Sequence, residues 1–169
     1  MTSASHAAMN ARRFDELRAW QLARAFKLGI YRLIESPPLV TDERLVTQLR
    51  EASRSAVSHV SEGFGRFDPL DFARFVKMAK ASLIECKNHL IDAVDRGHIS
   101  EETRKDHTDR ADAALAEMGG LLDYLQSPEA RRNAERIRQA RFERRRRSRN
   151  SKPGTPNEEP RTPNVEPER

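Results

Sequence analysis

The chain has 169 residues, of which 37% are apolar and 34% charged, and its formal net charge is +5. This length allows one ordinary domain with a tail and argues against two domains. The charge is uneven, because residues 131–150 hold ten Arg against two Glu, a local charge of +8, while residues 1–130 sum to −2. The high pI of about 9.8 therefore belongs to one segment of a nearly neutral body.

The single cysteine, Cys86, excludes an internal disulfide framework and suits a reducing compartment. The first ten residues contain no long apolar run, which argues against a signal peptide. No window approaches the roughly eighteen consecutive apolar residues of a membrane-spanning helix. We therefore expect a cytoplasmic protein that does not act at a membrane.

The first helix is predicted over residues 15–35 and ends at Ser36-Pro37-Pro38, because proline lacks the amide proton and restricts the residue before it. Its apolar positions are Leu17, Trp20, Ala23, Leu28, Tyr31 and Ile34. The second helix is predicted from an N-cap at Thr41, followed by two acids that favour the positive end of a helix dipole. It should run to about residue 62 and close at Gly63-Phe64-Gly65.

Asp68-Pro69, a capping carboxylate followed by proline, predicts the start of a third helix that ends at Gly97. Ser100 with the two glutamates after it predicts the cap of a fourth helix. On the third helix the inward positions are Phe72, Phe75, Val76, Ala79, Leu83, Cys86, Leu90 and Val94. On the fourth helix they are Ala111, Ala114, Leu115, Met118, Leu122 and Leu125. Each predicted helix is about 30 Å long, and the connections between helices are short. This pattern favours an all-α, antiparallel up-and-down four-helix bundle over residues 14–127.

The segments outside this bundle have a different composition. Residues 1–13 are expected to be a flexible N-terminus. Ser127-Pro128-Glu129 repeats the cap-proline-acid signal, so residues 128–148 should form an Arg-rich extension that is helical or disordered. Residues 149–169 are rich in Pro, Asn and Glu and should be a disordered tail.

The second helix carries an unusual inward stripe of small and polar residues. Its members are Leu49, Ala52, Ala56, His59 and Gly63, which recur at steps of three and four and so share one face. Small residues on that face allow another helix to come close, and the polar ones need partners inside the bundle.

A set of spaced motifs carries a family resemblance over residues 14–126. The motifs are Phe14-Asp15-Glu16-Leu17-Arg18-Ala19-Trp20-Gln21, Gln48-Leu49-Arg50, Ser55 with His59, Glu62-Gly63, Gly65-Arg66, Asp71-Phe72, Phe75, and Ala79-Lys80-Ala81-Ser82-Leu83-Ile84-Glu85. In this order they resemble the bacterial four-helix-bundle proteins called intervening-sequence proteins. Some of these are encoded in insertions within large-subunit ribosomal RNA genes, and the family includes the accessory variability protein of diversity-generating retroelements. The resemblance implies a homopentamer of bundles with nucleic acid or a reverse transcriptase as partner.

Ser55, His59 and Glu62 lie four and three residues apart on one predicted helix and could be taken for a nucleophile, a base and an orienting group. A working triad also needs an oxyanion site, which nothing in the sequence supplies. The structural interpretation is a buried polar row that bonds to neighbouring helices, with Ser82 and Glu85 as its partners. Arg50, Arg54 or Arg66 would then neutralise Glu62.

Glu85, Cys86 and His89 could be metal ligands, but the Glu-x-x-His pairs of carboxylate-bridged metal bundles do not occur. Cys86 is more simply a core residue. Gly63-Phe64-Gly65 joins two helices and lacks the strand that precedes a phosphate-binding loop. We therefore expect no metal, no cofactor and no enzyme activity.

The Arg-rich segment has two interpretations, a solvated tail and a phosphate-binding surface. Its arginines are Arg131, Arg132, Arg136, Arg138, Arg141, Arg144, Arg145, Arg146 and Arg147, with Arg50, Arg54 and Arg66 of the bundle as possible helpers. Only Phe142 could stack on a base, so binding would be largely independent of nucleotide sequence. The sequence favours a non-catalytic nucleic-acid-binding protein, and the family resemblance implies that it acts as a homo-oligomer. The alternative is a scaffold that binds a protein, such as a reverse transcriptase or a ribosome-associated factor.

Overall fold

A computed structural model describes residues 11–66 and 68–150, with side chains described as far as residue 148. Residues 1–10 of the expected flexible N-terminus and residues 151–169 of the expected disordered tail lie outside these ranges. Within them, all regular structure is helical and no strand occurs, which confirms the all-α class. No described helix is long and apolar enough to cross a membrane.

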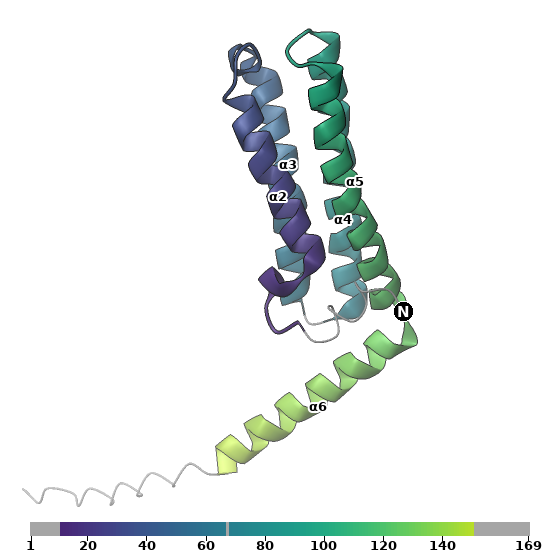
Figure 1. The fold of residues 1–169 in the computed structure, drawn as a ribbon. Helices are drawn as coiled ribbons and strands as arrows, with labels where there is room; N and C mark the ends of the chain where they lie inside the picture. The colour runs from purple at the N-terminus through teal and green to yellow at the C-terminus, as the bar shows by residue number, and fades with distance from the viewer. Residues whose placement is uncertain (1–10, 67, 151–169) are drawn as a thin grey trace, which may run out of the picture. The chain divides into compact units, whose positions relative to one another are not determined.

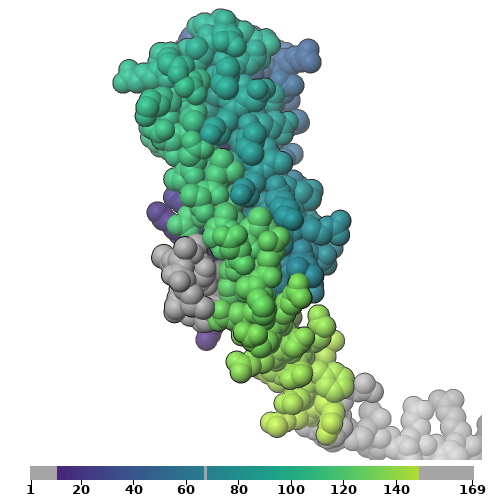
Figure 2. Space-filling model, turned by 90° about the vertical axis from the view of Figure 1, so that its right-hand side faces the viewer, coloured from purple at the N-terminus to yellow at the C-terminus, as the bar shows by residue number. Residues whose placement is uncertain are grey.

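Four long helices run side by side (Figure 1). The elements are η1 (Phe14–Glu16), α2 (Arg18–Ile34), η2 (Leu39–Thr41), α3 (Glu43–Gly65), α4 (Pro69–Asp95), α5 (Glu101–Gln126) and α6 (Pro128–Asn150). Helix α3 packs against α4, α4 against α5, and α2 against both α3 and α5. Figure 2 shows the face of this helical bundle that α4, in teal, and α5, in green, form together. Each of these helices therefore has two neighbours and can bury one side between them.

Three of the predicted helix starts are confirmed by side-chain caps. Oδ1 of Asp68 accepts hydrogen bonds from the backbone N–H groups of Leu70, at 2.9 Å, and Asp71, at 3.0 Å. Oγ of Ser100 accepts one from the N–H of Thr103 at 3.1 Å. Oγ of Ser127 accepts one from Ala130 at 3.2 Å. These caps satisfy amides that have no partner within the helix.

The predicted N-cap of the second helix was wrong by one residue. Thr41 is the last residue of η2, and its Oγ1 donates to the carbonyl oxygen of Pro38 at 2.7 Å. The cap is Asp42, whose Oδ1 accepts from the backbone N–H of Leu45 at 3.1 Å. Because Thr41 is part of the short 3-10 turn before α3, the capping position falls on the next residue, Asp42.

The second helix closes within Gly63-Phe64-Gly65, as predicted, since α3 ends at Gly65. Gly63 itself lies inside α3 and is buried. A Cβ atom at this position would clash with the ring of Phe72 and would lie 2.7 Å from Cβ of Phe75. The missing side chain therefore lets α4 approach the last turns of α3. The expected close approach at the small-residue stripe is confirmed here, and Ala52 and Ala56 of the stripe are also buried.

The core lies between α2, α3, α4 and α5. Leu83, Cys86, Leu90 and Met118 are fully buried, as predicted from the stripes of α4 and α5. Of the apolar positions named for the first helix, Leu17, Ala23 and Ile34 are buried, whereas Trp20, Leu28 and Tyr31 are only partly buried. The buried side of α2 follows Ala19, Ala23, Phe26, Ile30 and Ile34. Many residues of α2 are apolar, so periodicity alone did not fix its rotation.

The turn from α4 to α5 is closed by Gly97, whose φ of +72° is a left-handed conformation that favours glycine. Its N–H donates to the carbonyl of Val94, and the N–H of His98 donates to that of Ala93, each at 2.8 Å. This pair of bonds is a Schellman motif, which satisfies the last carbonyls of a helix. It fixes His98 directly after the end of α4.

The chain divides into two compact units, residues 1–135 and residues 136–169. The first turns of α6 belong to the bundle unit. Ala130 is buried, and Nδ2 of Asn133 donates to the hydroxyl oxygen of Tyr124 at 3.3 Å. The remainder of α6, from Arg136, belongs to the second unit.

Candidate nucleic-acid interface

The Arg-rich extension is helical as far as Asn150, the end of α6. Its start is fixed by the Ser127 cap and by Pro128, whose missing N–H costs nothing at the first helical position. Glu129 in the first turn adds a negative charge at the positive end of the dipole. Of the two alternatives given for residues 128–148, helical or disordered, the structure has the helical one.

Every predicted arginine of α6 is exposed to solvent. They are Arg131, Arg132, Arg136, Arg138, Arg141, Arg144, Arg145, Arg146 and Arg147. Successive helical residues are about 100° apart, so the four consecutive arginines Arg144–Arg147 point in all directions around the helix axis. The positive charge of this segment therefore surrounds α6.

The end of α6 keeps its charge available. None of Arg144–Arg147 forms an ion pair within the described part of the chain. The side chains of Ile137 and Phe142 are also exposed, at 55% and 67%. A bound anion would find guanidinium groups that are not neutralised by protein carboxylates, and one exposed aromatic ring.

The three predicted bundle arginines do not form one cluster. Arg50 and Arg54 are both exposed and lie one turn apart on the same side of α3. Arg66 follows the end of α3, about 18 Å further along the helix direction. Its Cζ lies 5.0 Å from the centre of the Phe75 ring, which is the geometry of a cation–π contact. Only Arg50 and Arg54 can therefore meet neighbouring phosphates.

The predicted buried polar row is wrong for its two glutamates. Glu62 and Glu85 are exposed, whereas Ser55 is half-buried and Ser82 is buried. No ion pair joins Glu62 to Arg50, Arg54 or Arg66 in the residues that the structure describes. The helical spacing places Ser55 and Glu62 on one side of α3, but an exposed carboxylate keeps its water and needs no partner.

His59, also a member of the predicted polar row, is partly buried in the structure. Its ring is half-buried beside Phe75, with 6.2 Å between the ring centres, and its Nδ1 has no hydrogen-bond partner. No described hydrogen bond connects Ser55, His59 and Glu62. The arrangement therefore lacks the contacts by which a base would activate a nucleophile.

The residues weighed as metal ligands, Glu85, Cys86 and His89, do not form a group that could hold a metal ion in the part of the chain that the structure describes. Cys86 is fully buried, and its Sγ lies 3.9 Å from the carbonyl oxygen of Leu49. Oε1 of Glu85 lies 3.9 Å from Nε2 of His89. Among the described residues, no three His, Cys, Asp or Glu side chains are grouped to hold a metal ion. Burial raises the pKa of the Cys86 thiol to about 12, because the thiolate would lose its water, and the charge of Glu85 adds to this.

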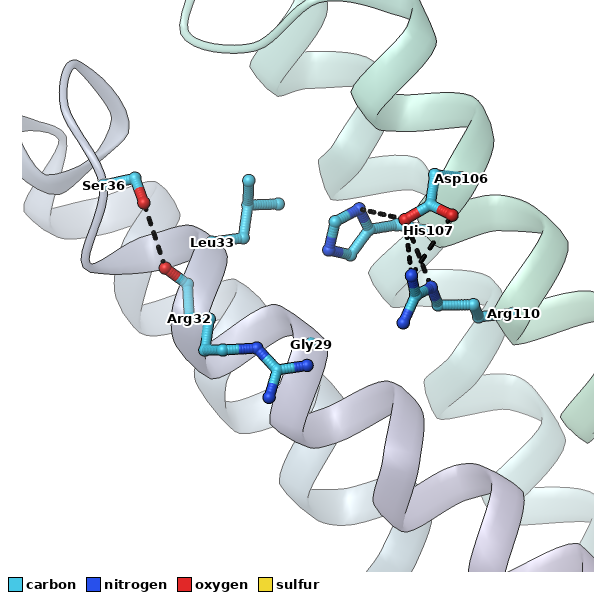
Figure 3. Close-up of a pocket in the computed structure, with 7 residues that line it drawn as sticks. All are labelled: Gly29, Arg32, Leu33, Ser36, Asp106, His107 and Arg110. Atoms are coloured by element: carbon cyan, nitrogen blue, oxygen red, sulfur yellow. Dashed lines mark hydrogen bonds and ion pairs between the residues drawn. The ribbon is translucent and has the colours of Figure 1, made fainter.

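A hollow between α2 and α5 was not anticipated from the sequence. It measures about 250 Å³ and is lined by Gly29, Arg32, Leu33, Ser36, Asp106, His107 and Arg110 (Figure 3). The one sequence signal was Gly29, a helix-weakening residue in the middle of an apolar helix. Exposed charges at helical spacing are common, so Arg32 and Arg110 did not stand out.

The sequence matches the family described as 23S rRNA-intervening sequence protein over residues 15–120, more than half of its length. The chain belongs to this family. The match extends from η1 into the second half of α5, so the part that this intervening-sequence protein shares with its family is the helical bundle. Helix α6 and its arginines lie beyond the match. No curated protein matches the chain.

Proposed function

We propose that this 23S rRNA-intervening sequence protein is a non-catalytic accessory protein that binds RNA or DNA electrostatically through the arginines of α6. The observation that carries the proposal is the set of exposed guanidinium groups at Arg144–Arg147, which form no ion pair with any described residue. Guanidinium groups bind phosphate oxygens, and each neutralised phosphate releases counterions. The family name, which refers to ribosomal RNA, agrees with a nucleic-acid partner.

The binding should depend little on nucleotide sequence. Phosphate contacts position a protein on nucleic acid, while base-edge contacts specify the sequence. On the exposed part of α6 only Phe142 offers an aromatic face to a base. Arg50 and Arg54 of α3 would add further phosphate contacts, and Arg66 would add one elsewhere on the bundle.

The proposal includes an antiparallel up-and-down four-helix bundle that self-associates, as a homopentamer according to the family resemblance. The ring of packing partners α2, α3, α4 and α5 and the short connections between them support the bundle. Exposed apolar side chains on α4 support self-association. Five copies would combine about +40 of charge from residues 131–150, and such multivalency raises the overall affinity.

The decisive measurement is the salt dependence of binding to a single-stranded and a duplex oligonucleotide by fluorescence anisotropy. The test variant replaces Arg144, Arg145, Arg146 and Arg147 with Gln in the full chain. The control variant removes the same charge from exposed positions of the bundle, with R18Q, R44Q, R74Q and K77Q.

We expect the test variant to bind more weakly and to reduce the slope of log K against log salt by up to about 3 units on duplex DNA. The control should change both quantities less. Equal binding by the two variants, or no binding by the wild type at low salt, would refute the proposed role of α6.

A second candidate function is a scaffold that binds a protein. Its partner would be a reverse transcriptase, which the family resemblance implies, or a ribosome-associated factor. The scaffold function is favoured by the exposed apolar side chains of Leu70, Ile84 and Ile91, which are spaced by multiples of seven along one side of α4. Loss of partner binding, with unchanged oligonucleotide binding, on charging this side of α4 would favour the scaffold.

We also propose that the protein has no catalytic centre. The exposure of Glu62 and the missing hydrogen bonds among Ser55, His59 and Glu62 support this. A folded His59→Ala variant should keep the full biological effect of the wild type, and loss of that effect in a folded variant would contradict this part of the proposal.

A further inference from the structure

Two arginines and one histidine line the hollow between α2 and α5. Arg32 comes from α2, while His107 and Arg110 come from α5 (Figure 3). In this view the imidazole lies between the helices, with the guanidinium group of Arg32 on α2 and that of Arg110 on α5. Such a convergence of donors from two helices differs from the isolated arginines elsewhere on the bundle.

Each of these side chains retains an unused donor or acceptor atom. Arg110 is held by Asp106, with Nη2 at 3.0 Å and Nε at 3.1 Å from Oδ2, so its Nη1 has no ion pair. Nδ1 of His107 donates to the carbonyl oxygen of Thr103 at 2.9 Å, which leaves Nε2 toward α2. Among the described residues, nothing pairs with the guanidinium group of Arg32.

Gly29 forms the side of the hollow next to the imidazole. It is buried in α2, and a Cβ atom on it would lie 3.6 Å from Nε2 of His107. The spacing is an ordinary van der Waals contact, so alanine would fit without strain. A glycine in the middle of a helix nevertheless costs up to about 1 kcal/mol relative to alanine. The space beside Nε2 is therefore kept open at some cost to helix stability.

We propose that this hollow binds a phosphate group in its monoester form, as carried by inorganic phosphate or a nucleoside monophosphate. A phosphomonoester presents three terminal oxygens, one for each of Arg32, His107 and Arg110. An internal phosphodiester presents only two. Arginine is well suited to such a ligand, because its planar donors match phosphate geometry.

Size and charge agree with this ligand. The volume of about 250 Å³ lies just below the range of about 300–1,000 Å³ for small-molecule pockets, so the phosphate would enter and the rest of the molecule would stay outside. The formal charges of Arg32, Arg110 and Asp106 sum to +1, which disfavours a metal cation. Asp106 is engaged by Arg110 and orients it. Since Nδ1 donates its proton to Thr103, Nε2 can accept a hydrogen bond, and a phosphomonoester that carries an O–H group can donate to it.

The test follows the side-chain nitrogens of His107 by NMR in the full-length protein, with the resonance assigned through His107→Gln. Inorganic phosphate, thymidine monophosphate and the diester-linked dinucleoside of thymidine are titrated separately at constant ionic strength, with chloride as the reference anion. We expect saturable shifts with the first two ligands and none with the dinucleoside.

Two substitutions inside the hollow and one control outside it test where phosphate binds. Arg32→Gln should weaken phosphate binding by about tenfold or more, whereas Arg24→Gln removes an exposed arginine of α2 outside the hollow and should not. Gly29→Ala fills the space beside Nε2 without changing any charge, and it should weaken binding while leaving the fold intact. The absence of saturable shifts, equal effects of the two arginine substitutions, or a response to the dinucleoside alone would overturn the proposal.

This site stands apart from the proposed role of α6. A chain in which Arg144–Arg147 are replaced by Gln should keep the phosphate response of His107 while losing oligonucleotide affinity. Loss of the phosphate response in that chain would assign the anion to α6 and would overturn the site in the hollow.

Discussion

Asp42 and Arg96 are 54 residues apart in sequence, yet Nη1 of Arg96 lies 3.0 Å from Oδ2 of Asp42. The same oxygen lies 3.1 Å from Nε2 of His98, while Oδ1 caps α3 through the N–H of Leu45. One carboxylate therefore joins the start of α3 to the end of α4. These bonds lower the pKa of Asp42, chiefly through the backbone bond from Leu45, with further contributions from His98 and Arg96.

The first prediction concerns Asp42→Asn. Asparagine is as good an N-cap as aspartate, so the substitution keeps the capping bond and removes the negative charge that faces Arg96. A carboxyl whose pKa is lowered by folding stabilises the protein above its unfolded pKa, and this contribution is lost as the pH falls through the folded pKa. We therefore expect the variant to melt at a lower temperature than the wild type at about pH 7, and the difference to shrink toward about pH 3.

The control for this measurement is Asp109→Asn, which breaks an exposed ion pair with Lys105 one turn away on α5. Exposed pairs of this kind contribute little, so its melting temperature should stay close to that of the wild type. If the difference in melting temperature between Asp42→Asn and the wild type did not change with pH, the carboxylate of Asp42 could not be the cause of that difference.

The second prediction concerns Gly63→Ala. The added methyl group would meet the ring of Phe72 and the Cβ atom of Phe75, and this Cβ cannot move without its backbone. Overpacking of a filled core costs about 1–3 kcal/mol. Urea unfolding should show a loss of this size.

Gly119→Ala is the matched control for Gly63→Ala. Gly119 also lies inside a helix, but a Cβ atom there has no neighbour within 4 Å. The usual preference of helices for alanine should then raise the free energy of unfolding by up to about 1 kcal/mol. A loss of unfolding free energy for Gly63→Ala together with a gain for Gly119→Ala would confirm that close helix packing requires Gly63. A change of the same sign in both variants would contradict it.

The third prediction concerns the reactivity of Cys86. With a pKa of about 12, only about one thiol in ten thousand is ionised near pH 8, and the sulfur atom is fully buried. A thiol reagent should therefore modify the native protein orders of magnitude more slowly than the protein in urea, as followed by mass spectrometry. Labelling of the native protein at the rate of the unfolded chain would contradict this burial.

The fourth prediction concerns the apolar side of α4. Ile84 and Ile91 are exposed, at 57% and 47%, although both are large aliphatic residues. If this side meets a second copy of the chain, the double substitution Ile84→Lys and Ile91→Lys should convert the oligomer to a monomer of 19.4 kDa in sedimentation experiments. Val40→Lys charges an exposed apolar residue on η2 and should leave the assembly unchanged. An oligomer that survives the double substitution would exclude this interface.

Helix boundaries were the most predictable part of the fold, because local chemistry sets them. The aspartate before Pro69 and the serines at positions 100 and 127 each cap a helix through their own side chains. Thr41 failed as a cap because a 3-10 turn, which carries no clear sequence signal, precedes α3. The predicted stop at Gly63-Phe64-Gly65 matches the end of α3 at Gly65, but the sequence does not show how close α4 comes to Gly63.

Contacts between helices were less predictable, because they depend on how each helix is rotated about its axis. The period of 3.6 residues places Ser55, His59 and Glu62 on one side of α3 but does not say which of them reaches the core. Glu62 in fact faces solvent. The hollow at Arg32 and His107 joins residues that are 75 positions apart, and no local pattern links them.

The arrangement of Arg144–Arg147 around the whole circumference of α6 has one further consequence. A partner lying along one side of this helix can touch only some of the four guanidinium groups at a time. Turning the helix about its long axis exchanges one group for another without a change in attraction. Because binding does not depend on how α6 is rotated, we expect a bound nucleic-acid strand to adopt many equivalent orientations, with no fixed register relative to α6.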